Sequence, residues 1–133
     1  MSQSNLPTAE TVLLRAHARA EQAVARNLRL RDVGFAEDET GAYVADACQV
    51  TLQAAGGGCR VDIGLPGGGA LDFQVPTAAI RGLCPACPLD GCRVDLYPWF
   101  DNYEVDIIRP DRTVFGFDVP TDAVQFSPPA QGR

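Results

Sequence analysis

The chain has 133 residues, 17 acidic and 11 basic side chains and a formal net charge of −6, and every basic residue is an arginine. Neutralising phosphates needs an excess of cationic side chains, so this balance disfavours nucleic-acid binding and favours a basic protein partner. No apolar run reaches the length of a bilayer span, and residues 1–11 lack the pattern of a secretion signal, so we expect a cytoplasmic protein without membrane contact.

The first predicted element is an amphipathic helix over residues 8–30. Thr8 can cap its N-terminus, and Glu10 lies in the first turn, where the helix dipole favours an acid. Helical spacing places an apolar stripe on one face, which we expect to pack on the rest of the protein and to include a packed histidine: Leu13, His17, Ala20, Val24 and Leu28.

The opposite face of this helix carries a stripe of arginines with Gln22 among them: Arg15, Arg19, Arg26 and Arg29. Two interpretations stay open for this stripe. It is either a solvated face, as on many surface helices, or a docking surface for an acidic partner or for a second subunit of a homodimer.

An internal repeat organises the rest of the chain, after a hairpin predicted over residues 33–45. Residues 46–80 align without a gap with residues 90–124 at an offset of 44, and 13 of the 35 positions are identical. Average composition predicts roughly two or three identities by chance. Apolar residues alternate with polar ones three times in each copy, so each copy is predicted to be a three-stranded antiparallel meander.

Each meander ends in a similar Phe-x-Val-Pro-Thr phrase, in which the proline is expected to end the strand and Thr77 or Thr121 to cap a short helical turn. Residues 81–89 connect the copies, and residues 125–133 are predicted to be a flexible tail. We therefore predict a single domain over residues 1–133 of the α+β class, with one N-terminal helix and six to eight antiparallel strands. The two meanders would form a pseudo-twofold sandwich, a half-open barrel or a curved sheet.

A group of cysteines is the first candidate site: Cys84, Cys87 and Cys92, with Cys59 or Cys48 as a fourth member. Thiolates at this spacing can bind a structural zinc ion, Cys84 and Cys87 can form a reversible disulfide, and all can be plain thiols. Cys48 and Cys92 occupy the same repeat position on the inward face, which favours the plain thiol for both. Apart from this zinc ion, we expect no cofactor.

Acidic residues form the second candidate. Strand alternation places five aspartates on the face opposite the core: Asp62, Asp72, Asp95, Asp106 and Asp118. They would either engage a basic partner or keep the sheet soluble. A hydrolase using Asp62 and Asp106 is a weaker hypothesis, because a solvated outer face does not perturb carboxylate pKa values as catalysis requires.

The third candidate is the aromatic segment 97–103, which replaces a Gly-rich turn of the first copy and carries Tyr97, Trp99, Phe100 and Tyr103. Its side chains are expected either to anchor a protein interface or to plug one end of the core. The glycine runs at residues 56–58 and 67–69 lack the context of a phosphate-binding loop and are predicted to be turns.

These patterns contain no catalytic constellation, so the leading hypothesis is a non-enzymatic inhibitor or adaptor that acts by protein–protein interaction, of the immunity-protein or phage anti-defence type. The candidate contact residues are Trp99, Phe100, Asp95, Asp106, Asp118, Arg15, Arg19 and Arg26. The alternative is a zinc-stabilised or thiol-redox module built on residues 84–92.

Overall fold

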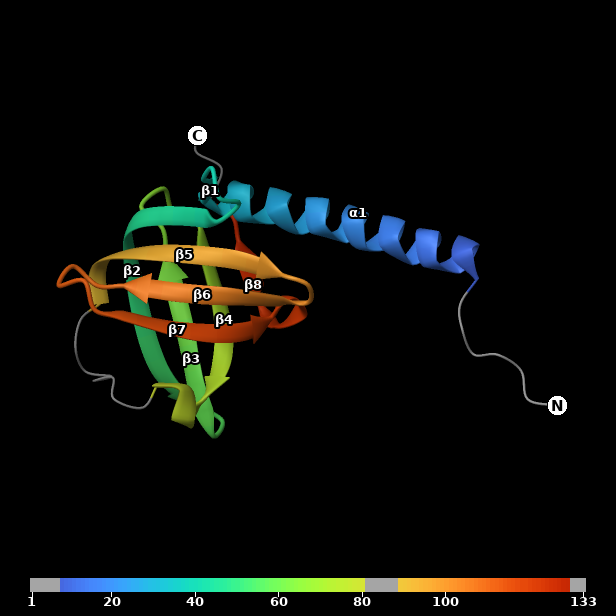
Figure 1. Ribbon diagram of the computed structural model, residues 1–133. Helices are drawn as coiled ribbons and strands as arrows, with labels where there is room; N and C mark the ends of the chain where they lie inside the picture. The colour runs from blue at the N-terminus through green and yellow to red at the C-terminus, as the bar shows by residue number, and fades with distance from the viewer. Residues whose placement is uncertain (1–7, 81–88, 130–133) are drawn as a thin grey trace.

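The computed structural model describes residues 8–80 and 89–129 (Figure 1). These residues form one helix and eight antiparallel strands, which confirms the predicted α+β class. The elements are α1 (Ala9–Val33), β1 (Ala36–Glu37), β2 (Tyr43–Ala55), β3 (Gly58–Gly64), β4 (Ala70–Pro76), the 3-10 turn η1 (Thr77–Ile80), β5 (Leu89–Trp99), β6 (Asn102–Ile108), β7 (Val114–Pro120), the 3-10 turn η2 (Thr121–Ala123) and β8 (Gln125–Ser127).

The strands form one open sheet in the order β7-β6-β5-β2-β3-β4-β8, and β1 pairs with the first two residues of β2. Strands β2, β3 and β4 run steeply across β5, β6 and β7, so the sheet folds over on itself (Figure 1). In each half the strands pair in chain order and in matching register, since Leu52 faces Val61 and Leu96 faces Val105. The common origin of the two segments stays a prediction.

The two halves join through β2 and β5, where Cys48 faces Cys92 and the register shifts on both sides of this pair. The preceding residues, Ala47 and Gly91, both have positive φ, at 58° and 71°. Such bulges bend a strand and increase its twist. The two bends are 44 residues apart, at the offset of the sequence repeat, and they turn one half of the sheet across the other.

Side chains from both halves fill one core. Phe73 of β4 and Phe117 of β7 meet edge to face, with ring centroids 5.9 Å apart, although these strands are far apart in the order of the sheet. Both are buried, as the alternation predicts, together with Val61 and Val105. The folded-over sheet thus buries the inner face that a single three-stranded meander would leave exposed.

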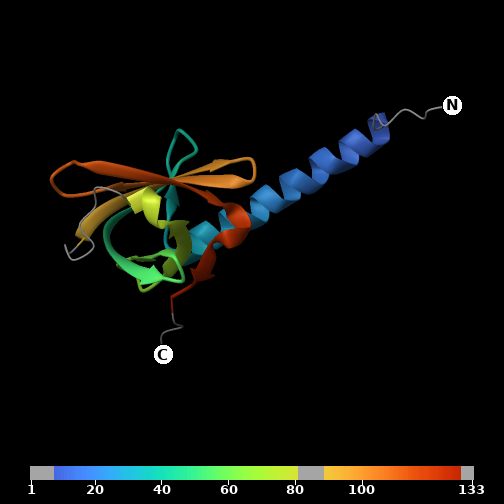
Figure 2. The same ribbon diagram turned by 90° about the horizontal axis from the view of Figure 1, so that it is seen from below.

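Helix α1 begins with the predicted cap, in which the Thr8 hydroxyl accepts a hydrogen bond from the Thr11 amide at 3.1 Å. It ends later than predicted, because Gly34 adopts a φ of 121° that lets its own amide and that of Phe35 bond back to Arg31 and Leu30. Leu30 and Val33 are its only buried residues. The N-terminal part projects away from the sheet (Figures 1 and 2).

The predicted packing face of α1 is therefore wrong. Leu13 is 69% exposed, and Val24 and Leu28 are also exposed. His17 is not a packed histidine, since its side chain is exposed and its Nε2 atom lies 2.7 Å from Glu21 Oε1. The rotation of the helix is decided by its last turns, where Leu30 and Val33 enter the core, and these turn the apolar stripe outward.

Strands β4 and β7 end at Pro76 and Pro120, as predicted. No side chain caps η2, so the prediction that Thr121 caps this turn is wrong. The Thr77 hydroxyl donates to the Gly57 carbonyl at 3.3 Å, and the Thr121 amide donates to the Asp101 carbonyl at 2.8 Å. Each threonine instead bonds to the hairpin turn of its own meander, which satisfies a turn carbonyl.

Candidate binding site at the β5–β6 hairpin

The β5–β6 hairpin ends in a two-residue turn, Phe100-Asp101, because β5 continues through Trp99 and β6 begins at Asn102. The aromatic side chains of this segment divide between two environments. Trp99 and Phe100 are 67% and 72% exposed and contact each other edge to face, whereas Tyr103 is fully buried. Tyr103 therefore fills the core, and the role of Trp99 and Phe100 as interface anchors stays a prediction.

Phe100 holds a backbone conformation that a side chain rarely adopts. Its φ is 53°, and Gly56, at the equivalent position of the first segment, also has a φ of 53°. A glycine adopts this left-handed conformation without cost, whereas a residue with a Cβ is strained by about 1–2 kcal/mol. The chain thus places an exposed aromatic residue where the turn itself favours glycine.

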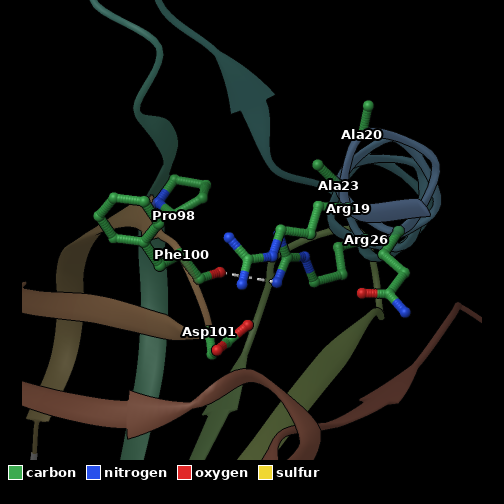
Figure 3. Close-up of a pocket in the computed structure, with 8 residues that line it drawn as sticks. Arg19, Ala20, Ala23, Arg26, Pro98, Phe100 and Asp101 are labelled. Carbon is green, nitrogen blue, oxygen red and sulfur yellow. Dashed lines mark hydrogen bonds between the residues drawn. The ribbon is translucent and has the colours of Figure 1, made fainter. Parts of the chain in front are cut away.

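Helix α1 and η2 hold the hairpin tip in place. Arg26 Nη1 donates hydrogen bonds to the Phe100 carbonyl at 2.9 Å and to the Thr121 hydroxyl at 3.4 Å (Figure 3). The backbone bond between Thr121 and Asp101 fixes the other side of the turn. Arg26 is half-buried by these contacts and belongs to the fold as well as to the candidate surface.

A trough runs along α1 beside this tip. Its first part, of about 590 Å³, lies between the helix residues Arg19, Ala23 and Arg26 and the hairpin residues Pro98, Phe100 and Asp101 (Figure 3). Its second part, of about 660 Å³, shares Gln22, Arg26 and Asp101 with the first and continues to Arg29, Asn102 and Asp122. We call this groove the arginine trough.

The arginine trough is basic although the protein is acidic. Among the described residues, no ion pair involves any of the four arginines of the helix stripe, Arg15, Arg19, Arg26 and Arg29. Near the trough, Arg26 Nε and the buried hydroxyl of Tyr103 have no hydrogen-bond partner within the described chain. Burial raises the pKa of Tyr103, and the positive charges of Arg26 and Arg29 oppose this shift.

An acidic patch, formed by Asp95, Glu104, Asp106 and Asp118, covers the outer face of β5, β6 and β7. Asp95 and Asp106 are cross-strand partners, and so are Glu104 and Asp118. Contrary to expectation, Asp95 is only 7% exposed. Arg93 Nε donates to it at 2.8 Å and the Tyr97 hydroxyl donates to it at 3.5 Å, so its neighbours along β5 shield it from solvent.

Asp106 is the least compensated carboxylate of this patch. Its Oδ1 atom lies 2.7 Å from the position that a Cβ on Gly116 would occupy, so a larger residue at position 116 would displace the carboxylate. Partial burial raises the pKa of Asp106, and the negative charges of Asp95 and Asp118 add to the effect. The surroundings of Asp106 thus disfavour the charged form of its carboxyl group.

The equivalent face of the first segment is compensated. Arg60 donates to Asp62 at 3.1 Å and to Asp72 at 3.2 Å. The residue aligned with Arg60 in the second segment is Glu104, and the residue aligned with Asp72 is Gly116. With a glutamate in place of the arginine, the outer face of the second half is more acidic than that of the first.

The described cysteines are buried core residues. The thiols of Cys48 and Cys92 donate to the carbonyls of Ala45 and Leu89, again 44 residues apart. Burial raises the pKa of the Cys48 thiol to about 11, and the nearby Cys92 and Asp46 add to this shift. Cys59 is buried on β3, on a different strand from Cys92.

Two of the proposed zinc ligands, Cys84 and Cys87, lie outside the described residues. Within the described residues, no three His, Cys, Asp or Glu side chains are placed to hold a metal ion. The zinc and redox hypotheses for residues 84–92 therefore stay predictions.

The structure gathers some of the candidate contact residues and separates others. Phe100, Arg19 and Arg26 line one trough, and Trp99 contacts Phe100. Asp95, Asp106 and Asp118 lie together on the outer sheet face. Arg15 is exposed one turn beyond Arg19. Sequence reasoning missed Asp101 and Thr121, although the alignment of Phe100 with Gly56 could have indicated the tip.

Comparisons with protein-family models, curated proteins and solved structures found no match to this chain. Among the described residues, no helix combines the length and the apolar character that crossing a bilayer requires.

Proposed function

We propose that the protein is a non-enzymatic binding protein, an inhibitor or adaptor that contacts a protein partner through the tip of the β5–β6 hairpin. The observation that carries the proposal is the conformation of Phe100. Backbone strain of about 1–3 kcal/mol clusters at ligand clamps and active sites. Three described non-glycine residues have positive φ, Ala47, Phe100 and Arg112, and only Phe100 is aromatic. Here the strained residue presents an aromatic ring to solvent beside the exposed Trp99.

The exposed pair has the composition of an interface anchor. Aromatic residues account for a disproportionate share of binding free energy in protein interfaces, provided that the partner excludes water around them. Arg26 and Thr121 hold the backbone of the tip before any partner binds, which lowers the ordering cost of association. A rigid turn with two exposed rings supports protein recognition.

The acidic patch supports a partner with a basic surface on that side of the hairpin. Its four carboxylates are accompanied by one ion-paired arginine, Arg93. Charges at the rim of an interface mainly raise the association rate and set its salt dependence. We expect charge reversal at Asp106 and Asp118 to slow association, most strongly at low ionic strength.

The experiment compares capture of a partner from the native host by immobilised wild-type protein and by Trp99→Ala. The captured protein is identified by mass spectrometry, purified and titrated by calorimetry. Trp99→Ala should raise the dissociation constant about 30-fold, which corresponds to a loss of roughly 2 kcal/mol of binding free energy.

Val114→Ala is the matched control. Val114 is an exposed apolar residue on β7, at the end of the β6–β7 pair remote from the tip. It should bind like the wild type. A Trp99→Ala protein that remains folded and binds with full affinity would exclude the hairpin tip as the anchor.

A further inference from the structure

We propose that the arginine trough binds an acidic segment of the protein partner, in which an apolar residue adjoins the carboxylates. This inference deepens the proposed function and rests on it. The trough lies at the tip of the hairpin on the side of α1, whereas the acidic patch lies on the outer sheet face. The exposed aromatic pair stands between two surfaces of opposite charge.

Charge complementarity is the first argument for an acidic occupant. Arg19 and Arg29 form no ion pair with any described residue, in a protein that carries six more acids than bases. Guanidinium groups bind carboxylates through parallel hydrogen bonds, which gives direction as well as charge.

The geometry of the trough is the second argument. Figure 3 shows the side chains of Arg19 and Arg26 extending from the helix towards the hairpin, and both residues line the first part of the trough. Arg26 uses Nη1 for the Phe100 carbonyl, and its Nε has no partner among the described residues. Arg26 is thus engaged with the hairpin and its Nε is buried, so Arg19 supplies the guanidinium that remains to bind an incoming anion.

The third argument concerns the apolar part of the occupant. The walls opposite each other in the first part of the trough include Ala20 and Ala23 on the helix and Pro98 and Phe100 on the hairpin. Small side chains on one wall and rings on the other leave room for an aliphatic side chain next to the carboxylates. A purely ionic ligand would leave these apolar surfaces in contact with water.

A single-stranded nucleic acid also combines negative charge with stacking on aromatic rings. The walls of the trough disfavour it, because Asp101 and Asp122 stand opposite the arginines and the acidic patch lies beyond the tip. A phosphate at every nucleotide would approach these carboxylates. A peptide can place its acids against the helix and neutral residues against the hairpin.

The probe is a short fluorescein-labelled peptide in which one leucine is flanked by glutamates, and binding is followed by fluorescence anisotropy. Two control peptides carry lysine in place of every glutamate or serine in place of the leucine. The acidic leucine peptide should bind most tightly, and its affinity should fall as the salt concentration rises. Equal affinity for the acidic and lysine peptides would overturn the inference.

The test variant is Arg19→Gln/Arg29→Gln, which avoids the structural Arg26. It should weaken binding of the acidic peptide about tenfold, the loss expected for two partly exposed charge-assisted contacts. Arg112→Gln, at the exposed turn between β6 and β7, is the control and should leave the affinity unchanged. An unaltered affinity in the double variant would place the peptide elsewhere and refute the trough.

Two further measurements separate other occupants. A labelled oligothymidine that binds more tightly than the acidic peptide, and loses affinity in the double variant, would reassign the trough to nucleic acid. Sedimentation that shows a dimer of the wild type and a monomer of the double variant would mean that a second copy fills the trough. Both results would overturn the inference.

The same variants distinguish this inference from the proposed function. Suppose that peptide binding depends on the arginines but that Trp99→Ala binds the captured partner at full affinity. The proposed aromatic anchor would then be refuted, and the proposed peptide site in the trough would stand. If Trp99→Ala loses partner binding and the wild type shows no preference for acidic peptides, the proposed anchor would stand and the proposed peptide site would be refuted.

Discussion

Replacement of Phe100 by glycine tests the strained turn, because fold stability and partner binding should respond differently. A left-handed backbone costs a residue with a Cβ about 1–2 kcal/mol, which glycine avoids. Glycine forfeits about 0.5–1 kcal/mol through its greater freedom in the unfolded chain. The lost contact with Trp99, in which the ring centroids are 5.2 Å apart, belongs to a class worth about 0.5–1.5 kcal/mol and is solvated here.

These contributions nearly cancel. Since the Phe100 side chain is 72% exposed, little burial is lost, and the free energy of unfolding should stay within about 1 kcal/mol of the wild-type value. Partner affinity should nevertheless fall at least tenfold, because an anchor of the interface is removed. Chemical denaturation followed by fluorescence gives the first quantity, and calorimetric titration of the partner gives the second.

Gly56→Ala is the matched control in the first segment. Its new Cβ would find only Gln74 Nε2 within reach, at 3.8 Å, so the cost is the backbone strain alone, about 1 kcal/mol after the gain from the unfolded state. Partner binding should be unchanged. A Phe100→Gly protein that loses more than about 2 kcal/mol of stability would show that the ring packs as part of the fold.

Three other predictions follow from the core, the acidic patch and the cysteines. Phe73→Ala and Phe117→Ala should each lower the free energy of unfolding by about 3–5 kcal/mol, whereas Asp62→Asn should change it by about 0.5 kcal/mol or less. A denaturation series with the opposite ranking would mean that the buried and the exposed faces of the sheet are assigned the wrong way round. Asp106→Asn should stabilise the protein at neutral pH. The raised pKa of Asp106 means that this carboxyl binds a proton more tightly in the folded state than in the unfolded state. The contribution of Asp106 to stability therefore falls as pH rises above the ordinary aspartate range. Thermal melting at several pH values should show this advantage shrinking towards pH 4, and an advantage that grows on acidification would contradict the assigned cause. Maleimide labelling of the native protein, followed by peptide mapping, should leave Cys48, Cys59 and Cys92 unmodified. All three are buried, and the raised pKa of Cys48 keeps its thiol protonated. Rapid labelling of any of them would show that the β2–β5 junction or β3 opens.

Local patterns in the sequence were sufficient to predict most elements of this fold. The prediction of a flexible tail was wrong for Gln125–Ser127, which form β8 and pair with β4. The alternation around Val61, Phe73, Val105 and Phe117 identified buried strand positions, because successive residues of a strand point to opposite faces. Thr8 marked the start of the helix, because a cap depends only on the residues of the first turn. The exposed Trp99 and Phe100 were found because the second segment departs there from the Gly-rich turn of the first.

The tertiary structure decided which surfaces these elements present. The direction of α1 depends on where Leu30 and Val33 enter the core, so the stripe from Leu13 to Leu28 turned outward and Arg26 turned inward to the hairpin. The burial of Asp95 depends on Arg93 and Tyr97 in their folded positions, which alternation along a strand does not describe. The arginine trough joins residues 19–29 to residues 98–122, and contacts between segments so distant in the chain are decided by packing of the whole fold and not by local propensity.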